Sequence, residues 1–390
     1  MKLLLFSHFF APSIGGVETL VLSLARGLSQ LRAADGHAKF AITLVTETPA
    51  AGYDDRALPF RVIRQPSRAQ LWKLLRACDV LHVAGPALWP IIFGRLAGKP
   101  VVVEHHGFQT ICPNGQLLIE PAGTPCPGHF MAGRHQECLR CNSGSGWWFS
   151  LRLWLLTFVR RALCARVPAN ITPTQWLGNL VQLPRVVAIP HGLDGADQPL
   201  LPSQHADPPV IAFLGRLVTT KSVGTLIEAA GILRREKMRF SLLIVGDGPE
   251  RAALEELANA EQLNGMVHFT GRLRADELDA AIARASIAVV PSLGGEVFGL
   301  VVAENMLRGL PVVASDLGAF QEVLGSTGLT FETSNASALA AQIRRLLDDP
   351  ALRASLGRQA RQRAMALCNL QRMLEAHESV YRDVVPARPA

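Results

Sequence analysis

Short apolar runs alternate along the chain with stretches of helical period, and this alternation occurs twice. In the first half, apolar runs predict the strands Lys2–Ser7, Phe40–Val45, Phe60–Ile63, Val80–Val83 and Pro100–Glu104. Apolar residues in helical phase predict the helices Val17–Leu31, Arg68–Ala77 and Leu88–Ala97. Strands that alternate with helices indicate a parallel, doubly wound sheet, in which ligands lie beyond the carboxyl ends of the strands.

The pattern starts again after a polar, proline-containing segment at 195–209, which we interpret as an interdomain linker. A strand and turn follow at Val210–Leu217, and further strands are predicted at 240–245, 266–271, 287–290 and 311–315. The last predicted helix, Gln371–Val384, has Leu374, His377 and Val380 in helical phase. The sequence therefore predicts an α/β protein of two Rossmann-like, doubly wound parallel-sheet domains that face a cleft. We expect domains at 1–193 and 194–370, with the C-terminal helix 371–390 packed back on the first.

The composition of the 390-residue chain fits two folded domains. The chain is 49% hydrophobic and only 18% charged, which supports two cores and argues against disorder. No apolar run reaches the ~18 residues of a membrane-spanning helix, and the N-terminal run is too short and too interrupted for a signal peptide. The odd total of 7 cysteines argues against full disulfide pairing, so we expect a reduced, cytoplasmic setting.

The net charge of +7 calls for an anionic partner. Basic residues are scattered and form no run interleaved with aromatic residues, so nucleic acid is not expected. A nucleoside diphosphate or an anionic membrane surface would suffice. The Trp-rich segment 146–163 is too short to span a bilayer. It is either a buried helix or a helix that rests on the inner face of a membrane, with Trp147, Trp148 and Trp154 at the interface.

Four of the cysteines lie in an insert at 107–146, namely Cys112, Cys126, Cys138 and Cys141. The last two have the two-residue gap of a metal knuckle, and four thiolates would hold a structural zinc ion. Disulfides and free buried thiols are the alternatives.

Chemistry-bearing residues gather after the strands of the second half. The segment Pro291–Ser315 is a glycine-rich turn, a helix and a strand, and it carries Glu296 in the turn and Glu304 in the helix. Carboxylates suit the hydroxyls of a sugar or a ribose, and glycine lets a ligand approach the backbone. Arg216 and Lys221 follow the first strand of this half, where they could bind a diphosphate. A second glycine turn, Gly246-Asp247-Gly248, follows the next strand.

The first half offers two further candidates. Gly15 and Gly16 open the first helix, where backbone N–H groups can face a phosphate or a sugar, although a tight βα turn explains them equally well. His105, His106 and Gly107 follow the strand Pro100–Glu104, at the edge of the sheet where ligands bind.

Taken in order, these motifs resemble the retaining glycosyltransferases of family 4, which have the two-domain GT-B fold. The resemblance rests on the segments GGVE (15–18), a His after VVVE, GRLVTTK (215–221), VGDGP (245–249) and EVFGLVVAE (296–304). The last is the E-x7-E pattern of the family, and together the segments cover nearly the whole chain. A subset of the family has a His, five residues and then Cys-Pro, which aligns His106 with Cys112 and includes a later cysteine cluster.

The resemblance implies a role for each matching residue. Arg216 and Lys221 would hold the donor diphosphate, and His106 would lie near the sugar hydroxyls. Glu304 would bind the ribose, and Glu296 the donor sugar. The remaining donor contacts would come from Gly15, Gly16, Gly246, Asp247, Gly248, Val297, Phe298, Gly299 and Leu300. The chain departs from the family pattern at Ser222, where Gly is usual, and at His191, where Asn is usual.

We therefore expect a retaining enzyme that transfers a sugar from a UDP- or GDP-sugar to a glycan or lipid-linked acceptor, in the assembly of a polysaccharide, lipopolysaccharide or glycolipid. No Asp-x-Asp metal clamp follows a strand, so the two cations would replace Mg²⁺ and no cofactor is expected for catalysis. Two alternatives stay open: a sugar-nucleotide epimerase of the same fold, and a non-catalytic protein that binds sugar nucleotides.

Overall fold

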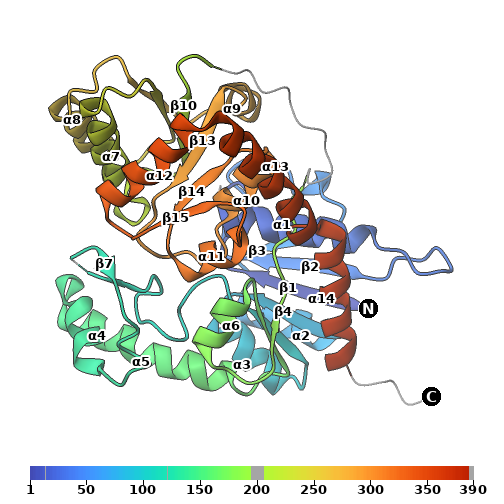
Figure 1. Ribbon diagram of the computed structural model, residues 1–390. Coiled ribbons are helices and arrows are strands. Elements are labelled where there is room, and N and C mark those ends of the chain that lie inside the picture. Colours follow the sequence, from blue (N-terminus) through green and yellow to red (C-terminus); the bar gives the residue numbers. More distant parts are fainter. Residues whose placement is uncertain (14, 121, 195–205, 386–390) are drawn as a thin grey trace. The chain divides into compact units, whose positions relative to one another are not determined.

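The computed structural model describes residues 1–13, 15–120, 122–194 and 206–385, and it divides into two compact units (Figure 1). The first unit comprises Met1–Leu117, Pro127–Asp194 and Cys368–Ala390, and the second comprises Leu118–Cys126 and Gly195–Leu367. Most of the predicted linker, residues 195–205, lies outside the described residues. The short segment 118–126, which the sequence-based division assigns to the first domain, is counted with the second unit.

The first unit is built on a parallel sheet of seven strands in the order β3-β2-β1-β4-β5-β8-β9. These strands are β1 (Lys2–Ser7), β2 (Ala41–Thr46), β3 (Arg61–Arg64), β4 (Val80–Ala84), β5 (Val101–Glu104), β8 (Ala169–Thr172) and β9 (Val186–Ala188). Its helices are α1 (Gly16–Gln30), α2 (Arg68–Ala77), α3 (Leu88–Leu96), α4 (His135–Cys141), α5 (Trp147–Cys164), α6 (Gln175–Val181) and α14 (Leu370–Val384), with 3-10 turns η1 (Asp55–Ala57) and η2 (Ser143–Ser145).

Both faces of this sheet are buried, as the continuous apolar strands predict. Leu3 and Leu5 of β1 pack in a core with α1 and α14, whereas Leu4 and Phe6 pack in a second core with α2 and α3. Successive side chains of a strand point to opposite faces, so one unbroken apolar run supplies both cores. The C-terminal helix α14 therefore belongs to the first unit, with Leu374 buried against α1.

The second unit repeats the plan with a parallel sheet in the order β12-β11-β10-β13-β14-β15. These strands are β10 (Val210–Leu214), β11 (Ser241–Val245), β12 (Val267–Gly271), β13 (Ala285–Val290), β14 (Val312–Ser315) and β15 (Leu329–Phe331). Its helices are α7 (Val223–Arg235), α8 (Arg251–Ala260), α9 (Ala275–Ile282), α10 (Leu300–Leu307), α11 (Gly318–Leu324), α12 (Ala336–Asp348) and α13 (Pro350–Leu367), with the 3-10 turn η3 (Thr219–Lys221). The short hairpin of β6 (Leu118–Ile119) and β7 (Thr124–Pro125) is counted with this unit.

The two faces of the second sheet are covered by different helices. One core joins Ile211 and Phe213 of β10 to α7, α8 and α12. On the other face α10, α11 and α13 pack together. Helix α10 contacts β13 and β14, and α11 contacts β14. The prediction of two parallel-sheet α/β domains is therefore confirmed.

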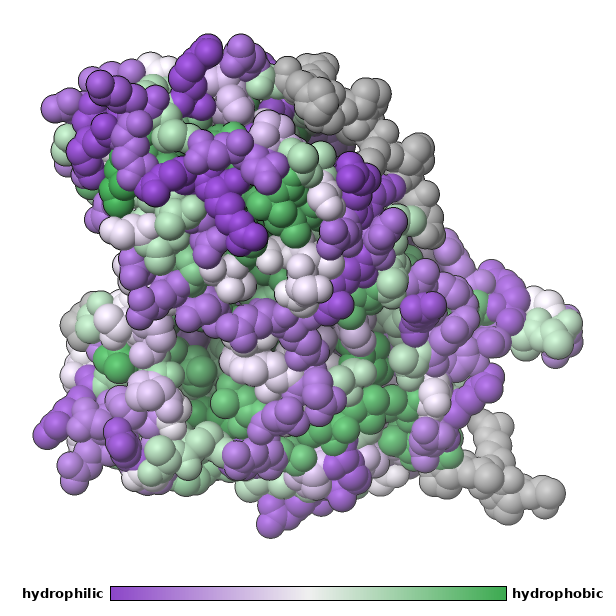
Figure 2. All heavy atoms as spheres, viewed as in Figure 1, coloured by the Kyte–Doolittle hydropathy of each residue, from purple (hydrophilic) through white to green (hydrophobic). Residues whose placement is uncertain are grey.

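Helix α5 contains the Trp-rich segment, and none of its large apolar side chains is buried. Of its residues only Ser150, Thr157 and Cys164 are buried, whereas Trp147 is 56% exposed and Trp148 is 78% exposed. The alternative of a buried helix is therefore wrong, because the residues that face the core are the small ones. Figure 2 shows hydrophobic side chains at the surface of the region where α3 and α5 are labelled in Figure 1. Among the helices that the structure describes, none has both the length and the hydropathy needed to cross a bilayer.

Candidate active site

The strand order of the second sheet reverses between β10 and β13. Such a switch opens a crevice at the carboxyl ends of the two strands, which is where ligands bind in open α/β sheets. The turn after β10 and the loop after β13 meet there, because the Leu293 N–H donates to the carbonyl of Thr220 at 2.9 Å. The topology thus brings together two segments that are far apart in the sequence.

Two of the predicted site residues form an ion pair at this point. The Lys221 ammonium, on η3, donates to Oε1 of Glu296 in the loop after β13. The Ser292 hydroxyl donates to the same carboxylate oxygen at 3.2 Å. The side chains of Lys221 and Glu296 are 21% and 15% exposed. The pair is therefore fixed by its neighbours but still open to a ligand.

Arg216 lies two residues after the end of β10, and its side chain is exposed at the same edge of the sheet. Ser222, one residue after Lys221, has a φ of 48°, in the left-handed region that favours glycine. This backbone conformation explains physically why glycine is usual at this position in the family that the sequence resembles. The Ser222 and Thr225 hydroxyls lie 2.9 Å apart at the start of α7.

The turn Gly246-Asp247-Gly248 packs against the backbone that follows β10. The Leu217 N–H donates to the Asp247 carbonyl at 3.0 Å. A Cβ atom at Gly246 would lie 1.8 Å from the Gly215 carbonyl oxygen, and one at Gly248 would lie 2.2 Å from that of Leu217. These glycines are therefore required for two loops to pass at backbone distance, whatever ligand contact they also make.

The helix α10 begins at Leu300, after Gly299 in a left-handed conformation with φ 93°. A side chain at Gly299 would collide with the ring of Phe320, while Phe298 is buried and Val297 is half-buried. Burial raises the pKa of Glu304 in this helix above its ordinary value, although Arg308 acts in the opposite direction. A carboxylate held away from water is suited to ligand hydroxyls, which replace the lost solvation.

In the first unit, Gly15 is the N-cap of α1 and Gly16 is its first residue. Gly15 has extended backbone angles, and a Cβ atom there would meet only the flexible side chain of Glu18. The free N–H groups of the first turn are available to an anion, but packing does not require glycine at position 15.

The two histidines after β5 have different surroundings. His105 Nε2 lies 3.0 Å from Oδ1 of Asn170, inside the sheet. His106 stacks on His191 and its Nε2 lies 3.6 Å from Oε2 of Glu104. Burial lowers the pKa of His106, although the carboxylate of Glu104 acts in the opposite direction. Of the two, His106 is the better candidate for contact with a polar ligand.

Glu104 is the centre of a buried polar cluster that the sequence reasoning missed. His82, His106, His191 and His377 all have a ring nitrogen within 4 Å of its carboxylate. Burial alone would raise the pKa of Glu104, but the histidines around it, His106 first, lower it well below its usual range. The available signal was His82 within the apolar strand VLHVA, and His377 on the apolar stripe of α14.

The structure places none of the four cysteines of the insert in a disulfide. Cys138 and Cys141 lie on α4, and the Asn114 side chain lies between Cys112 Sγ at 3.0 Å and Cys141 Sγ at 3.7 Å. Cys126 is the last residue of the segment Leu118–Cys126, which belongs to the second unit. The zinc site on these four residues stays a prediction.

The second unit is similar to known proteins in its sequence, and the whole chain is similar to known proteins in its fold. Residues 202–363 match the family model described as "Glycosyl transferases group 1". A glycogen synthase of Mycobacterium tuberculosis is 34% identical over 202 residues, which are 51% of this chain and 49% of the relative. A phosphatidyl-myo-inositol mannosyltransferase of Mycolicibacterium smegmatis is 36% identical over 183 residues, 45% of this chain and 47% of the relative. The chain spans about half the length of the curated relatives it matches.

Solved structures extend the likeness to both sheets. HepE of Anabaena, crystallised with UDP, superimposes with a TM-score of 0.74 at 18% identity, over 98% of this chain and 100% of that one. A sucrose-phosphate synthase of Thermosynechococcus elongatus gives a TM-score of 0.71 at 21% identity, over 98% of both chains. At these identities the likeness concerns the fold, which is the GT-B fold. Residues 202–363 thus resemble the group 1 glycosyl transferases in sequence, and both sheets together have the GT-B fold.

Proposed function

We propose that this chain is a retaining glycosyltransferase that moves a sugar from a nucleoside-diphosphate sugar to an acceptor hydroxyl. The observation that carries the proposal is the Lys221–Glu296 ion pair at the switch of strand order, inside the segment that matches the family. A cation and a carboxylate held side by side suit a donor that presents a diphosphate next to sugar hydroxyls.

The reaction places new negative charge on the leaving diphosphate. The bond from the anomeric carbon to the phosphate oxygen breaks, the acceptor oxygen bonds to that carbon, and the acceptor proton passes to the leaving phosphate. Lys221 and Arg216 stabilise the growing charge without a bound metal ion. Glu296 orients Lys221 and accepts hydrogen bonds from the sugar, and Glu304 accepts them from the ribose. The acceptor attacks on the face from which the phosphate leaves, so configuration is retained.

UDP-glucose and GDP-mannose are the first donors to test. HepE was solved with UDP-glucose, and a relative from Corynebacterium glutamicum is named as GDP-mannose-dependent. Slow release of UDP or GDP in the absence of acceptor identifies the donor. A glycosylated acceptor then supports transfer, whereas an epimerised donor, or a donor that is bound and returned unchanged, contradicts it.

The pH dependence of donor binding tests Glu304. Because burial raises the pKa of this carboxyl, it protonates at a higher pH than an exposed glutamate does. If ionised Glu304 binds the ribose, the Kd of the donor rises as the pH falls through that pKa. The Glu304→Gln variant should bind more weakly and lose this dependence. The same slope in both proteins, measured by calorimetry, contradicts the role.

The exposed apolar surface of α5 supports a membrane-proximal acceptor. Trp147 and Trp148 begin the helix, Trp89 of α3 is 51% exposed, and α3 packs against α5. Arg152 is exposed on the same helix. Aromatic side chains with nearby arginine suit the interface of an anionic bilayer. We therefore propose that the acceptor is lipid-linked and that the protein binds the inner face of the membrane.

Vesicle flotation tests the membrane contact. Changing Trp147 and Trp148 to Ser should lower the fraction bound to phosphatidylglycerol vesicles at least ~10-fold, because two large apolar side chains no longer enter the interface. Added salt should weaken binding of the unaltered protein by screening its basic charge. Val187→Ser is the control, since Val187 is 40% exposed on β9. Equal flotation of all three proteins would contradict the proposal.

A further inference from the structure

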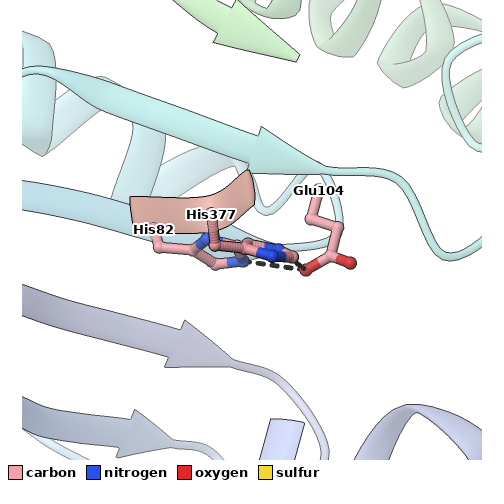
Figure 3. Close-up of side chains that lie close together, drawn as sticks. All are labelled: His82, Glu104 and His377. Carbon is pink, nitrogen blue, oxygen red and sulfur yellow. Dashed lines mark ion pairs between the residues drawn. The ribbon is translucent and has the colours of Figure 1, made fainter. Parts of the chain in front are cut away.

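Three side chains from separate elements of the first unit meet at one buried point (Figure 3). His82 comes from β4, Glu104 ends β5, and His377 comes from α14. Oε2 of Glu104 lies 3.1 Å from His82 Nε2 and 3.7 Å from His377 Nε2. The three ligand-type atoms lie within 4.8 Å of one another. Their side chains are 0%, 4% and 0% exposed, so water does not solvate them.

The hydrogen-bond partner of His377 determines which ring nitrogen carries the proton. Its Nδ1 lies 2.8 Å from the Met373 carbonyl oxygen, which can only accept, so Nδ1 carries a hydrogen. A neutral ring then has its lone pair on Nε2, facing the carboxylate of Glu104. Two electron-rich atoms that face one another in a dry interior are unfavourable unless a positive charge lies between them.

His82 has a similar arrangement. Its Nδ1 lies 2.8 Å from the Tyr381 hydroxyl, one turn along α14 from His377, which leaves Nε2 to face Glu104. That nitrogen lies 3.1 Å from Oε2, yet the two atoms form no hydrogen bond. Both Nε2 atoms are buried without a hydrogen-bond partner. Two nitrogens and an oxygen that lie close without aligning on one another are arranged like ligands of one ion, rather than as donor and acceptor.

The spacing and chemistry match a transition-metal site. In a tetrahedral zinc site with bonds of ~2.0–2.1 Å, neighbouring ligand atoms lie ~3.3 Å apart. The distances of 3.1 and 3.7 Å from Glu104 Oε2 to the Nε2 atoms of His82 and His377 lie on either side of that value. A ligating histidine usually donates its other N–H to a carbonyl or a similar acceptor, as His377 does to Met373. Imidazole nitrogens favour zinc over calcium or magnesium, which prefer oxygen.

We propose that His82, Glu104 and His377 bind a zinc ion that fastens α14 to the carboxyl ends of β4 and β5. The ion neutralises the buried carboxylate and satisfies both nitrogens. It is separate from any zinc held by the cysteines of the insert, because its ligands are nitrogen and oxygen only.

X-ray absorption of the unaltered protein tests the site without any variant. The full chain is expressed without a polyhistidine tag, supplied with zinc, and measured for metal content and for the zinc coordination shell. We expect bound zinc with nitrogen or oxygen neighbours at ~2.0–2.1 Å. Zinc surrounded only by sulfur at ~2.3 Å, or less than about a tenth of a zinc per chain, overturns the proposal.

Variants assign the ion to its ligands. His377→Gln should lower the zinc content by one ion per chain and remove the nitrogen and oxygen shell, whereas His268→Gln, on the exposed surface of β12, should leave both unchanged. Cys138→Ser should also leave that shell in place. An unchanged shell in His377→Gln overturns the assignment, and if that variant does not fold, the absorption spectrum of the unaltered protein decides.

Discussion

Replacement of Lys221 by Ala is expected to lower turnover at least ~10²-fold, the scale on which one preorganised electrostatic contact acts in a transition state. Lys221 is the cation that the structure holds beside Glu296, at the carboxyl ends of β10 and β13. In the proposed reaction its charge acts when the diphosphate leaves, so the loss should fall on kcat more than on donor KM. Release of UDP or GDP from the donor identified by screening is the measurement.

A double-mutant cycle with Glu296→Gln tests whether the two residues act as a unit. Each single change should cost at least ~10²-fold. If Glu296 acts mainly by orienting Lys221, the double variant should lose little more than the worse single variant. Full additivity of the two losses would mean that the ion pair has no role in catalysis, even though each residue has one.

The control for charge is Lys73→Ala, which removes the same charge from the exposed surface of α2. Turnover of this variant should equal that of the unaltered protein, since exposed charges contribute little. Thermal unfolding of Lys221→Ala checks that the unit remains folded with Glu296 unpaired. Turnover close to that of the unaltered protein in a folded Lys221→Ala variant would refute the assignment of the site.

The fold could be predicted closely because burial on both faces leaves a strong local pattern. The helix Arg68–Ala77 and the strand Lys2–Ser7 have the predicted bounds. The strand β15 was missed, since Leu329–Phe331 is short and lies among helices. For helix α5 the sequence left a buried and a surface position open, because hydropathy along a segment does not reveal which of its side chains a neighbour covers.

The candidate site was predictable only where its residues follow strands of the same sheet. Lys221 and Glu296 each sit after a strand, and the parallel topology brings those strand ends together. The residues around Glu104 could not be predicted in this way. His82 and Tyr381 are 299 positions apart, and only the packing of α14 on the first sheet brings them to 2.8 Å. A lone histidine in an apolar stripe gives no sign of its partner.

Replacement of Gly246 by Ala is expected to destabilise the second unit more than any surface change, by about 3 kcal/mol. The new Cβ would lie 1.8 Å from the Gly215 carbonyl oxygen, and φ at this position is 139°. A backbone atom cannot rotate away as the end of a side chain can, so the turn after β11 or the turn after β10 must move. The midpoint of thermal unfolding should fall by roughly 10 °C.

The matched control is Gly265→Ala, which separates strain from collision. Gly265 has a φ of 76°, but a Cβ there meets nothing within 4 Å. The free energy of unfolding of this variant should fall only by the cost of a left-handed alanine, about 1 kcal/mol. Because the turn after β10 leads directly to Lys221, Gly246→Ala should also reduce donor turnover at temperatures where it remains folded, whereas Gly265→Ala should not. Equal unfolding midpoints for the two variants would mean that the turns after β10 and β11 do not pass at backbone distance, and the geometry assigned to the site would then be wrong.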